Sequence, residues 1–250
     1  MPDEVRRLTR KYVGFACHAV LRRGVIPTLA DFISTAWFDL RHGLRAAMPM
    51  EVTASGAAGN ASVLDAVQYQ GVSPRTVLEM LNRLPPCALQ SHFVDYGCGK
   101  GRGMAVGMIA GFRHVVGVEM MPALAILAEG NLLRLRKRFP ETVVHVCVMD
   151  AAMFVPREGP LVAFLYNPFR GETLRRVVAR IREHAQRHPV WVLYVNPVEL
   201  GVFHESGFET RSELRHRDQL DAVLLESMDA RPGDAAGTQT AIRSMASVRN

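Results

Sequence analysis

The chain has 250 residues, of which 48% are hydrophobic and 22% are charged. This length suits one sizeable domain with extensions, and the composition excludes low-complexity and collagen-like proteins. No apolar run reaches the roughly 18 residues that a membrane span needs, and the first residues lack the pattern of a signal peptide. The formal net charge of +6 would suit nucleic acid, but only Lys11, Lys100 and Lys137 among the 30 basic residues are lysines. We therefore attribute the charge to an arginine-rich composition and favour protein or small-molecule partners over nucleic acid.

The cysteines and histidines show no paired spacing typical of a metal site. The four cysteines, Cys17, Cys87, Cys98 and Cys147, lie far apart in the sequence, and the histidines are scattered. We expect reduced thiols, no bound metal and a cytoplasmic protein.

Residues 1–72 are predicted to form a helical or lid-like extension. Within them, residues 5–21 have the pattern of a basic amphipathic helix, which could pack against the main domain or lie on an anionic membrane surface. Residues 27–52 are mixed and aromatic, with a turn predicted at residues 39–43. The small-residue run at 55–62 indicates a mobile loop.

Residues 73–228 have the pattern of a doubly wound α/β domain. Ser73 is placed as the N-cap of a helix that starts at Pro74 and stops before Pro85 and Pro86. Short apolar runs, typical of buried parallel strands, follow at His92–Tyr96, His114–Glu119, Val143–Val148, Leu161–Tyr166 and Val190–Val195. Helical segments at residues 104–110, 122–138 and 172–187 alternate with most of them, which predicts a mostly parallel sheet covered on both faces.

Two final apolar runs, at residues 208–214 and 222–227, are separated by only seven residues. This connection is too short for a helical crossover, so we predict an antiparallel hairpin that completes a seven-stranded sheet. Residues 229–250 are rich in Ala, Gly, Ser, Thr and Arg and are predicted to be a disordered tail.

A glycine-rich loop joins the first predicted strand to the helix after it. Its glycines occupy alternate positions, at Gly97, Gly99, Gly101 and Gly103. Such glycines let a ligand approach the backbone, and the following helix start offers free N–H groups, so a nucleotide-like ligand is indicated. The loop does not match a P-loop, because Lys100 is not followed by Ser or Thr. It fits the dinucleotide fingerprint poorly, because Arg102 stands where close packing of helix on strand requires Gly or Ala.

Three carboxylates lie near the carboxyl ends of consecutive predicted strands. Asp95 precedes the glycines and suits a ligand that carries a cation or an amine. Glu119, followed by Met120, stands where an acid can accept both hydroxyls of a ribose. Asp150, followed by Ala151, is placed to contact the exocyclic amine of an adenine.

Together these residues resemble the class I S-adenosylmethionine-dependent methyltransferases. The Asp-x-Gly-x-Gly-x-Gly pattern of that family is matched by Asp95, Gly97, Gly99 and Gly101, and the terminal hairpin is similar to the end of its sheet. The resemblance covers about residues 73–228 and implies a Rossmann-like methyltransferase fold and S-adenosyl-L-methionine as cofactor. It implies these cofactor-binding residues: Asp95, Tyr96, Gly97, Cys98, Gly99, Gly101, Glu119, Met120, Asp150 and Ala151.

The sequence Tyr166-Asn167-Pro168-Phe169 follows the fourth predicted strand, where this family places its substrate motif. It is similar to the Asn/Asp-Pro-Pro-aromatic motif of amino-group methyltransferases but has one proline in place of two. The resemblance implies methyl transfer to a nitrogen, of protein lysine or another amine, with Asn167 orienting the target and the aromatic ring covering it. Asn196 and Pro197 end the fifth strand, and we interpret them as a structural turn. Two alternatives remain: a non-catalytic S-adenosylmethionine-binding scaffold or sensor, and an NAD-dependent oxidoreductase.

Overall fold

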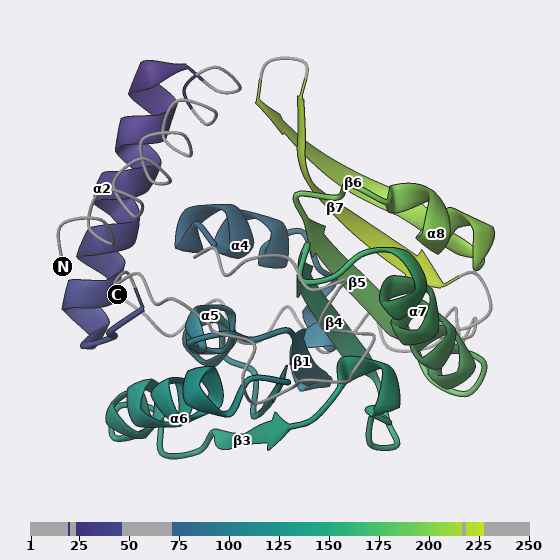
Figure 1. The fold of residues 1–250 in the computed structure, drawn as a ribbon, viewed down its shortest axis with the longest axis horizontal. Coiled ribbons are helices and arrows are strands. Elements are labelled where there is room, and N and C mark those ends of the chain that lie inside the picture. The colour runs from purple at the N-terminus through teal and green to yellow at the C-terminus, as the bar shows by residue number, and fades with distance from the viewer. Residues whose placement is uncertain (1–19, 21–23, 47–71, 217–218, 228–250) are drawn as a thin grey trace, which may run out of the picture.

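The computed structural model describes residues 20, 24–46, 72–216 and 219–227. Its centre is a seven-stranded sheet with the order β3-β2-β1-β4-β5-β7-β6 (Figure 1). The strands are β1 (His92–Tyr96), β2 (His114–Glu119), β3 (Val143–Val148), β4 (Leu161–Tyr166), β5 (Val190–Val195), β6 (Phe208–His216) and β7 (Gln219–Ser227). The first five are parallel, and β7 pairs antiparallel with both β5 and β6. The predicted fold class is therefore confirmed, and the five parallel strands have the predicted bounds.

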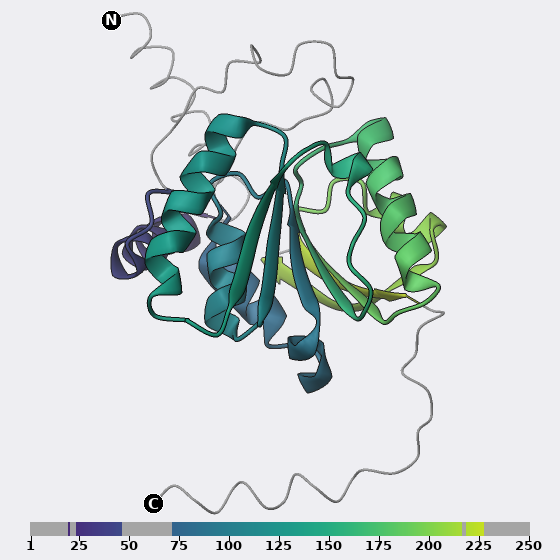
Figure 2. The ribbon, with the colours of Figure 1, turned by 90° about the horizontal axis from the view of Figure 1, so that it is seen from below.

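Helices cover both faces of the sheet, as Figure 2 shows with the sheet seen nearly edge-on. One face carries α4 (Pro74–Leu81), α5 (Arg102–Ala110) and α6 (Pro122–Arg136), and the other carries α7 (Gly171–Ala185) and α8 (Leu200–Glu205). Two 3-10 turns complete the connections, η2 (Pro86–Gln90) and η3 (Ala151–Met153). No helix in the described part of the chain is both long and apolar enough to cross a membrane.

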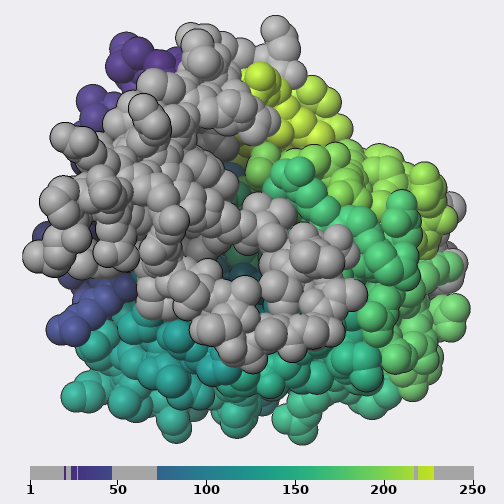
Figure 3. Space-filling model, in the orientation of Figure 1, coloured from purple at the N-terminus to yellow at the C-terminus, as the bar shows by residue number. Residues whose placement is uncertain are grey.

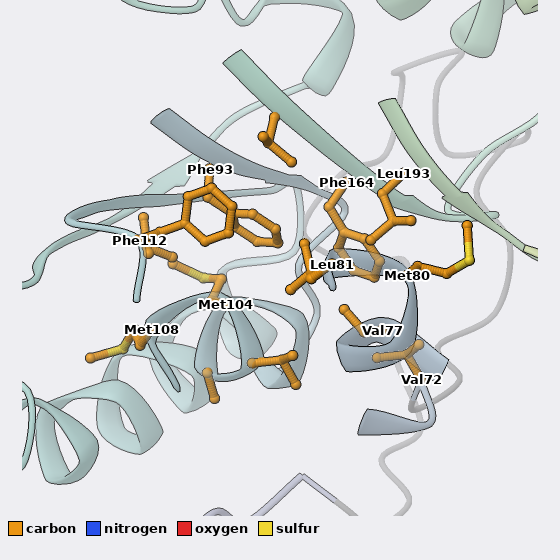
Figure 4. Packing of buried hydrophobic residues seen from close by; sticks show 14 of the residues in the cluster. Val72, Val77, Met80, Leu81, Phe93, Met104, Met108, Phe112, Phe164 and Leu193 are labelled. Atoms are coloured by element: carbon orange, nitrogen blue, oxygen red, sulfur yellow. The ribbon is translucent and has the colours of Figure 1, made fainter. Parts of the chain in front are cut away.

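A hydrophobic core between the sheet and helices α4 and α5 holds α5, the helix after the glycine loop, against β1. Aliphatic and methionine side chains of both helices pack on the sheet, among them Val77, Met80, Met104 and Met108 (Figure 4). Phe93 of β1 lies beneath them and stacks on Phe164 with 5.8 Å between ring centroids. A Cβ atom on Gly107 would lie 2.9 Å from the Phe93 ring, so this glycine allows α5 to pack closely on the strand.

The predicted turn at residues 39–43 is wrong, because helix α2 (Val25–His42) runs through it. The helix ends at Gly43, which has the left-handed φ of 66° typical of a helix C-terminus. Ser73 occupies the N-cap position of α4, as predicted, but its side chain makes no capping hydrogen bond. Its hydroxyl donates instead to Asp31 of α2 at 3.1 Å. The predicted helix at 5–21, apart from Val20, the loop at 55–62 and the tail at 229–250 lie outside the described residues.

A buried ion pair joins α2 to the helix after the glycine loop. The Arg102 guanidinium donates to both carboxylate oxygens of Asp39, at 3.0 Å from Nε and 2.6 Å from Nη2. The expectation that Arg102 obstructs the packing of helix on strand is wrong, because its side chain turns toward α2. Gly103 faces the sheet instead, where a Cβ atom would lie 2.5 Å from both Asp95 and Phe164.

We predict that Asp39→Ala lowers the free energy of unfolding by about 3–5 kcal/mol, because it leaves the Arg102 charge buried without its carboxylate. The two side chains are only 4% and 6% exposed. Urea titration followed by circular dichroism measures the change. Glu79→Ala, which removes the exposed Arg83–Glu79 pair, is the control and should cost less than about 1 kcal/mol.

The double variant Asp39→Leu/Arg102→Met should recover most of the loss, since two apolar side chains of similar size need no partner. If Asp39→Ala costs no more than the exposed control, the pair does not hold α2 to the domain.

Candidate functional site

The candidate site lies at the carboxyl edge of the parallel strands. Here β1 stands between β2 and β4, and the chain runs from β1 toward one side of the sheet and from β4 toward the other. Open α/β sheets bind ligands at such a point, because two neighbouring loops diverge there. The strand register sets Tyr96 level with Val118 and Leu165, so the loops after β1, β2 and β4 leave the sheet side by side.

The glycine loop takes a conformation that residues with a side chain rarely adopt. Gly97, Gly99 and Gly101 have φ values of 80°, 54° and 80°. The N–H groups of Gly97 and Cys98 both donate to the carbonyl of Val118, at 2.8 and 3.0 Å, which ties the loop to β2. A Cβ atom on Gly97 would lie 2.4 Å from Cβ of Pro168. The loop after β1 therefore packs directly on the predicted substrate motif after β4.

Glu119 is buried and turned toward this loop. One carboxylate oxygen accepts the N–H of Gly99 at 2.9 Å, and the other accepts the N–H of Met121 at the same distance. Burial raises the pKa of the carboxyl, and these backbone N–H groups oppose the rise. The structure thus places an oriented carboxylate beside the glycine loop, at the predicted ribose position.

Asp95 lies deeper, only 3% exposed. Burial raises its pKa well above the usual 3.8, and the negative charge of Glu119 raises it further. The N–H of Met104 at the start of α5 donates to Asp95 and partly opposes this shift. Two neighbouring buried acids, on β1 and at the end of β2, suit a ligand that brings a positive charge or hydrogen-bond donors.

The remaining predicted cofactor residues lie around the same edge. Asp150 is half-buried and caps η3, with one carboxylate oxygen accepting the N–H of Ala152 at 2.9 Å. Ala151 is buried, and Met120 is half-buried. Cys98 is buried beneath the loop, where a Cβ atom on Gly117 would lie 2.7 Å from its sulfur. Burial raises the pKa of the Cys98 thiol, so it is a packing residue and a poor nucleophile.

Asn167 combines an unusual backbone conformation with a buried side-chain oxygen that has no described hydrogen-bond donor. Its φ is 39°, and Asn196 with 52° is the other described residue besides glycine with a positive φ. Asn167 is 4% exposed, and no described group donates to its buried amide oxygen. An unsatisfied buried carbonyl oxygen costs about 1–3 kcal/mol, so a donor from a ligand would relieve it.

The two aromatic residues of the motif lie in different surroundings. Phe169 is 6% exposed and packs in the core beneath α7, as a structural residue would. Tyr166, at the end of β4, is half-buried. Tyr96 is fully buried, and its hydroxyl has no described partner. In this structure Tyr166 is therefore the motif's aromatic residue that a ligand could reach.

Two features of the site were not predicted from the sequence. Gly103 is the residue that lets helix α5 approach the sheet closely, whereas the dinucleotide fingerprint places this glycine at position 102. The alternating glycines of the loop were the sequence feature that could have indicated it. Asp39 partners Arg102 from 63 residues away, and nothing in the local sequence indicates that pairing. Among residues 20, 24–46, 72–216 and 219–227, no group of three His, Cys, Asp or Glu side chains could hold a metal ion.

No model of a known protein family matches the chain, and no curated protein matches its sequence. The structure is similar to that of the ribosomal protein L11 methylase of Lactobacillus delbrueckii subsp. bulgaricus, with a TM-score of 0.47 and 13% identity over 63% of this chain and 79% of that one. It is also similar to the glycopeptide N-methyltransferase MtfA in complex with S-adenosyl-L-methionine, with a TM-score of 0.47 and 13% identity over 63% and 94% of the two chains. A third similar structure is that of a TehB-like methyltransferase of Corynebacterium glutamicum, with a TM-score of 0.42 and 14% identity over 80% of this chain and 98% of that one. At this identity the likeness concerns the fold, and function has to be inferred from the residues of the site.

We predict that Gly97→Ala destabilises the protein by about 2 kcal/mol or more, because the new methyl group meets Pro168 and the φ of 80° is strained. Gly43→Ala is the matched control: its φ is 66°, and nothing lies within 4 Å of the added Cβ. It should show backbone strain alone, about 1 kcal/mol. Equal losses in urea unfolding would mean that the loop does not pack tightly on Pro168.

We predict that the ligand-free protein loses stability as the pH rises above the ordinary Asp95 pKa of 3.8. Since the folded state holds the proton to a higher pH than the unfolded state does, the unfolded state binds fewer protons in this window and the free energy of unfolding falls. Asp95→Asn should make the melting temperature fall less between about pH 5 and pH 8. Equal slopes for the two proteins would show that Asp95 does not titrate abnormally.

Proposed function

We propose that this protein is an S-adenosylmethionine-dependent methyltransferase that transfers the methyl group to a nitrogen. The observation that carries the proposal is the contact between Gly97 and Pro168, which joins a cofactor-type glycine loop to a buried, unsatisfied asparagine amide. Cofactor and acceptor would then meet in one place, at the switch point between β1 and β4.

The residues around the loop suit this cofactor. Glu119 would accept the ribose hydroxyls, and Asp150 would accept a hydrogen bond from the adenine amine. The glycine loop would let the cofactor lie close to the backbone. A cationic ligand would favour the ionised form of the buried Asp95 carboxyl, which burial and the charge of Glu119 otherwise disfavour. When bound, S-adenosylmethionine supplies an activated methyl group on a sulfonium.

Asn167 would orient the acceptor. Its free amide oxygen can accept a hydrogen bond from a target N–H, which fixes the direction of the nitrogen lone pair. Because the methyl group is already activated, orientation supplies most of the rate and no strong general base is required. The half-buried Tyr166 would cover the acceptor, in place of Phe169. An amine of protein lysine or of a small molecule fits these groups.

The cofactor is tested by thermal shift with S-adenosylmethionine, S-adenosylhomocysteine and NAD. We expect the first two to raise the melting temperature of the wild type and to raise that of Glu119→Ala much less. Stabilisation by NAD alone would contradict the proposal and favour the oxidoreductase.

Catalysis is tested with cofactor that carries a labelled methyl group and a cell lysate as the source of acceptors. Asn167→Gly removes the amide without straining the positive φ, and Asn196→Gly is the matched control. We expect Asn167→Gly to lower methyl transfer by about 100-fold with unchanged cofactor affinity, and Asn196→Gly to keep most of it. Cofactor binding without transfer by any variant would favour the scaffold.

A further inference from the structure

Helix α2 exposes an apolar face and turns its polar side toward the domain, the reverse of an ordinary surface helix. At about 100° per residue, the exposed apolar residues fall within an arc of about 140°. They include Ile26, Leu29, Phe32, Ile33, Trp37 and Leu40, with Ile26 81% and Leu40 82% exposed. α2 lies at the outer side of α4, along the left edge of the molecule in Figure 3.

The acids of α2 all point inward. Asp31 accepts the hydroxyl hydrogen of Ser73, and Asp39 is paired with Arg102. Both partners belong to the main domain, so this side of the helix is already occupied. The outward face therefore contains no acidic residue of α2, and its apolar side chains are exposed in the described part of the chain.

Exposed arginines lie at or near the carboxyl end of α2: Arg41, Arg45, Arg134 and Arg138, here called the arginine rim. The Arg41 guanidinium lies 5.0 Å from the centroid of the Trp37 ring. Arg138 of the segment after α6 donates to the carbonyl of Arg41 at 3.4 Å, and Arg134 reaches that of Gly43 at 3.5 Å. Partial burial and the positive charges of Arg138 and Arg41 lower the pKa of His42. The rim thus places positive charge next to an apolar face that carries a tryptophan.

We propose that the apolar face of α2, with the arginine rim, docks on an anionic membrane surface. Aliphatic and aromatic side chains would enter the boundary of the acyl chains, and the rim would contact anionic headgroups. The tryptophan suits this boundary, because its ring is apolar and its N–H group is polar.

Two other possible partners for this face, a second copy of the chain and the chain's own residues 5–21, carry positive charge that would repel the arginine rim. A second copy packed face to face would bring its own basic residues against the rim, whether the helices run parallel or antiparallel, since Arg22 and Arg23 precede α2 in the sequence. The chain's own residues 5–21 carry Arg6, Arg7, Arg10 and Lys11, so they too would bring positive charge against the rim. An anionic surface complements both the apolar face and the rim.

The test is flotation of the full chain with vesicles of phosphatidylcholine, alone or with about 30% phosphatidylserine. We expect the protein to float with the anionic vesicles and much less with the neutral ones, and added salt should weaken binding. Ile33→Glu/Leu40→Glu should reduce the bound fraction about tenfold or more, because it puts carboxylates into the apolar face. Leu89→Glu, at an exposed apolar residue of η2, should leave flotation unchanged.

Arg41→Glu/Arg45→Glu tests the rim and should abolish the preference for anionic vesicles while the apolar face is intact. Unchanged melting temperature and unchanged thermal shift with S-adenosylmethionine show that the α2 variants remain folded. Failure of the full chain to float would overturn the proposal, as would equal flotation of Ile33→Glu/Leu40→Glu. A wild-type dimer that this variant splits, measured by light scattering, would assign the face to a second copy instead.

Discussion

Two carboxylates buried beside a glycine loop are the constraint on which the site depends. Asp95 and Glu119 both lie under 10% exposed, and burial raises the pKa of each. Removing two acids from water is unfavourable unless hydrogen-bond donors or a cation compensate. Backbone N–H groups of Gly99, Met104 and Met121 supply part of that compensation. A cationic ligand that carries hydroxyl donors would supply more, which is why the loop suits a sulfonium nucleoside.

The strand order brings the carboxylates and the asparagine motif to one edge of the sheet. Because β1 has β2 on one side and β4 on the other, the acid of β2 and the asparagine after β4 reach the same glycine loop. The approach of Gly97 to Pro168 leaves no room for a side chain between them. Helix α2 is connected to this centre as well, since Asp39 holds Arg102 at the first residue of α5. The Asp39–Arg102 ion pair thus connects α2, which carries the surface that we propose binds a membrane, directly to the end of the glycine loop.

Much of the fold follows from the sequence, because the parallel strands are continuous apolar runs bounded by polar or glycine residues. For β1 to β5 the apolar runs and the observed strands have the same ends. The inner strands β1, β4 and β5 are buried on both faces, which makes their runs continuous, whereas β3 lies at the edge of the sheet and is partly exposed. The loop and its acids could be identified because their spacing along the chain reflects local geometry. Phe169 shows the limit of this approach, since a motif cannot tell whether an aromatic ring faces a ligand or the core.

Helix α2 could not be predicted for a related reason. Its polar side is buried and its apolar side is exposed, so its hydrophobic pattern does not indicate which side meets the domain. The Asp39–Arg102 pair that decides its orientation joins residues distant in sequence. A long-range ion pair leaves no periodic pattern in the local sequence. Without that pattern, residues 39–43 were predicted to form a turn, although they belong to the last turn of α2 and its cap.

A crystal structure of the full chain grown with S-adenosylhomocysteine tests the central claim most directly. The account predicts the ribose hydroxyls on Glu119, the adenine near Asp150, and the sulfur beside the glycine loop on the side of Asn167. Electron density for the nucleoside at any other place, or none at saturating concentration, would contradict it.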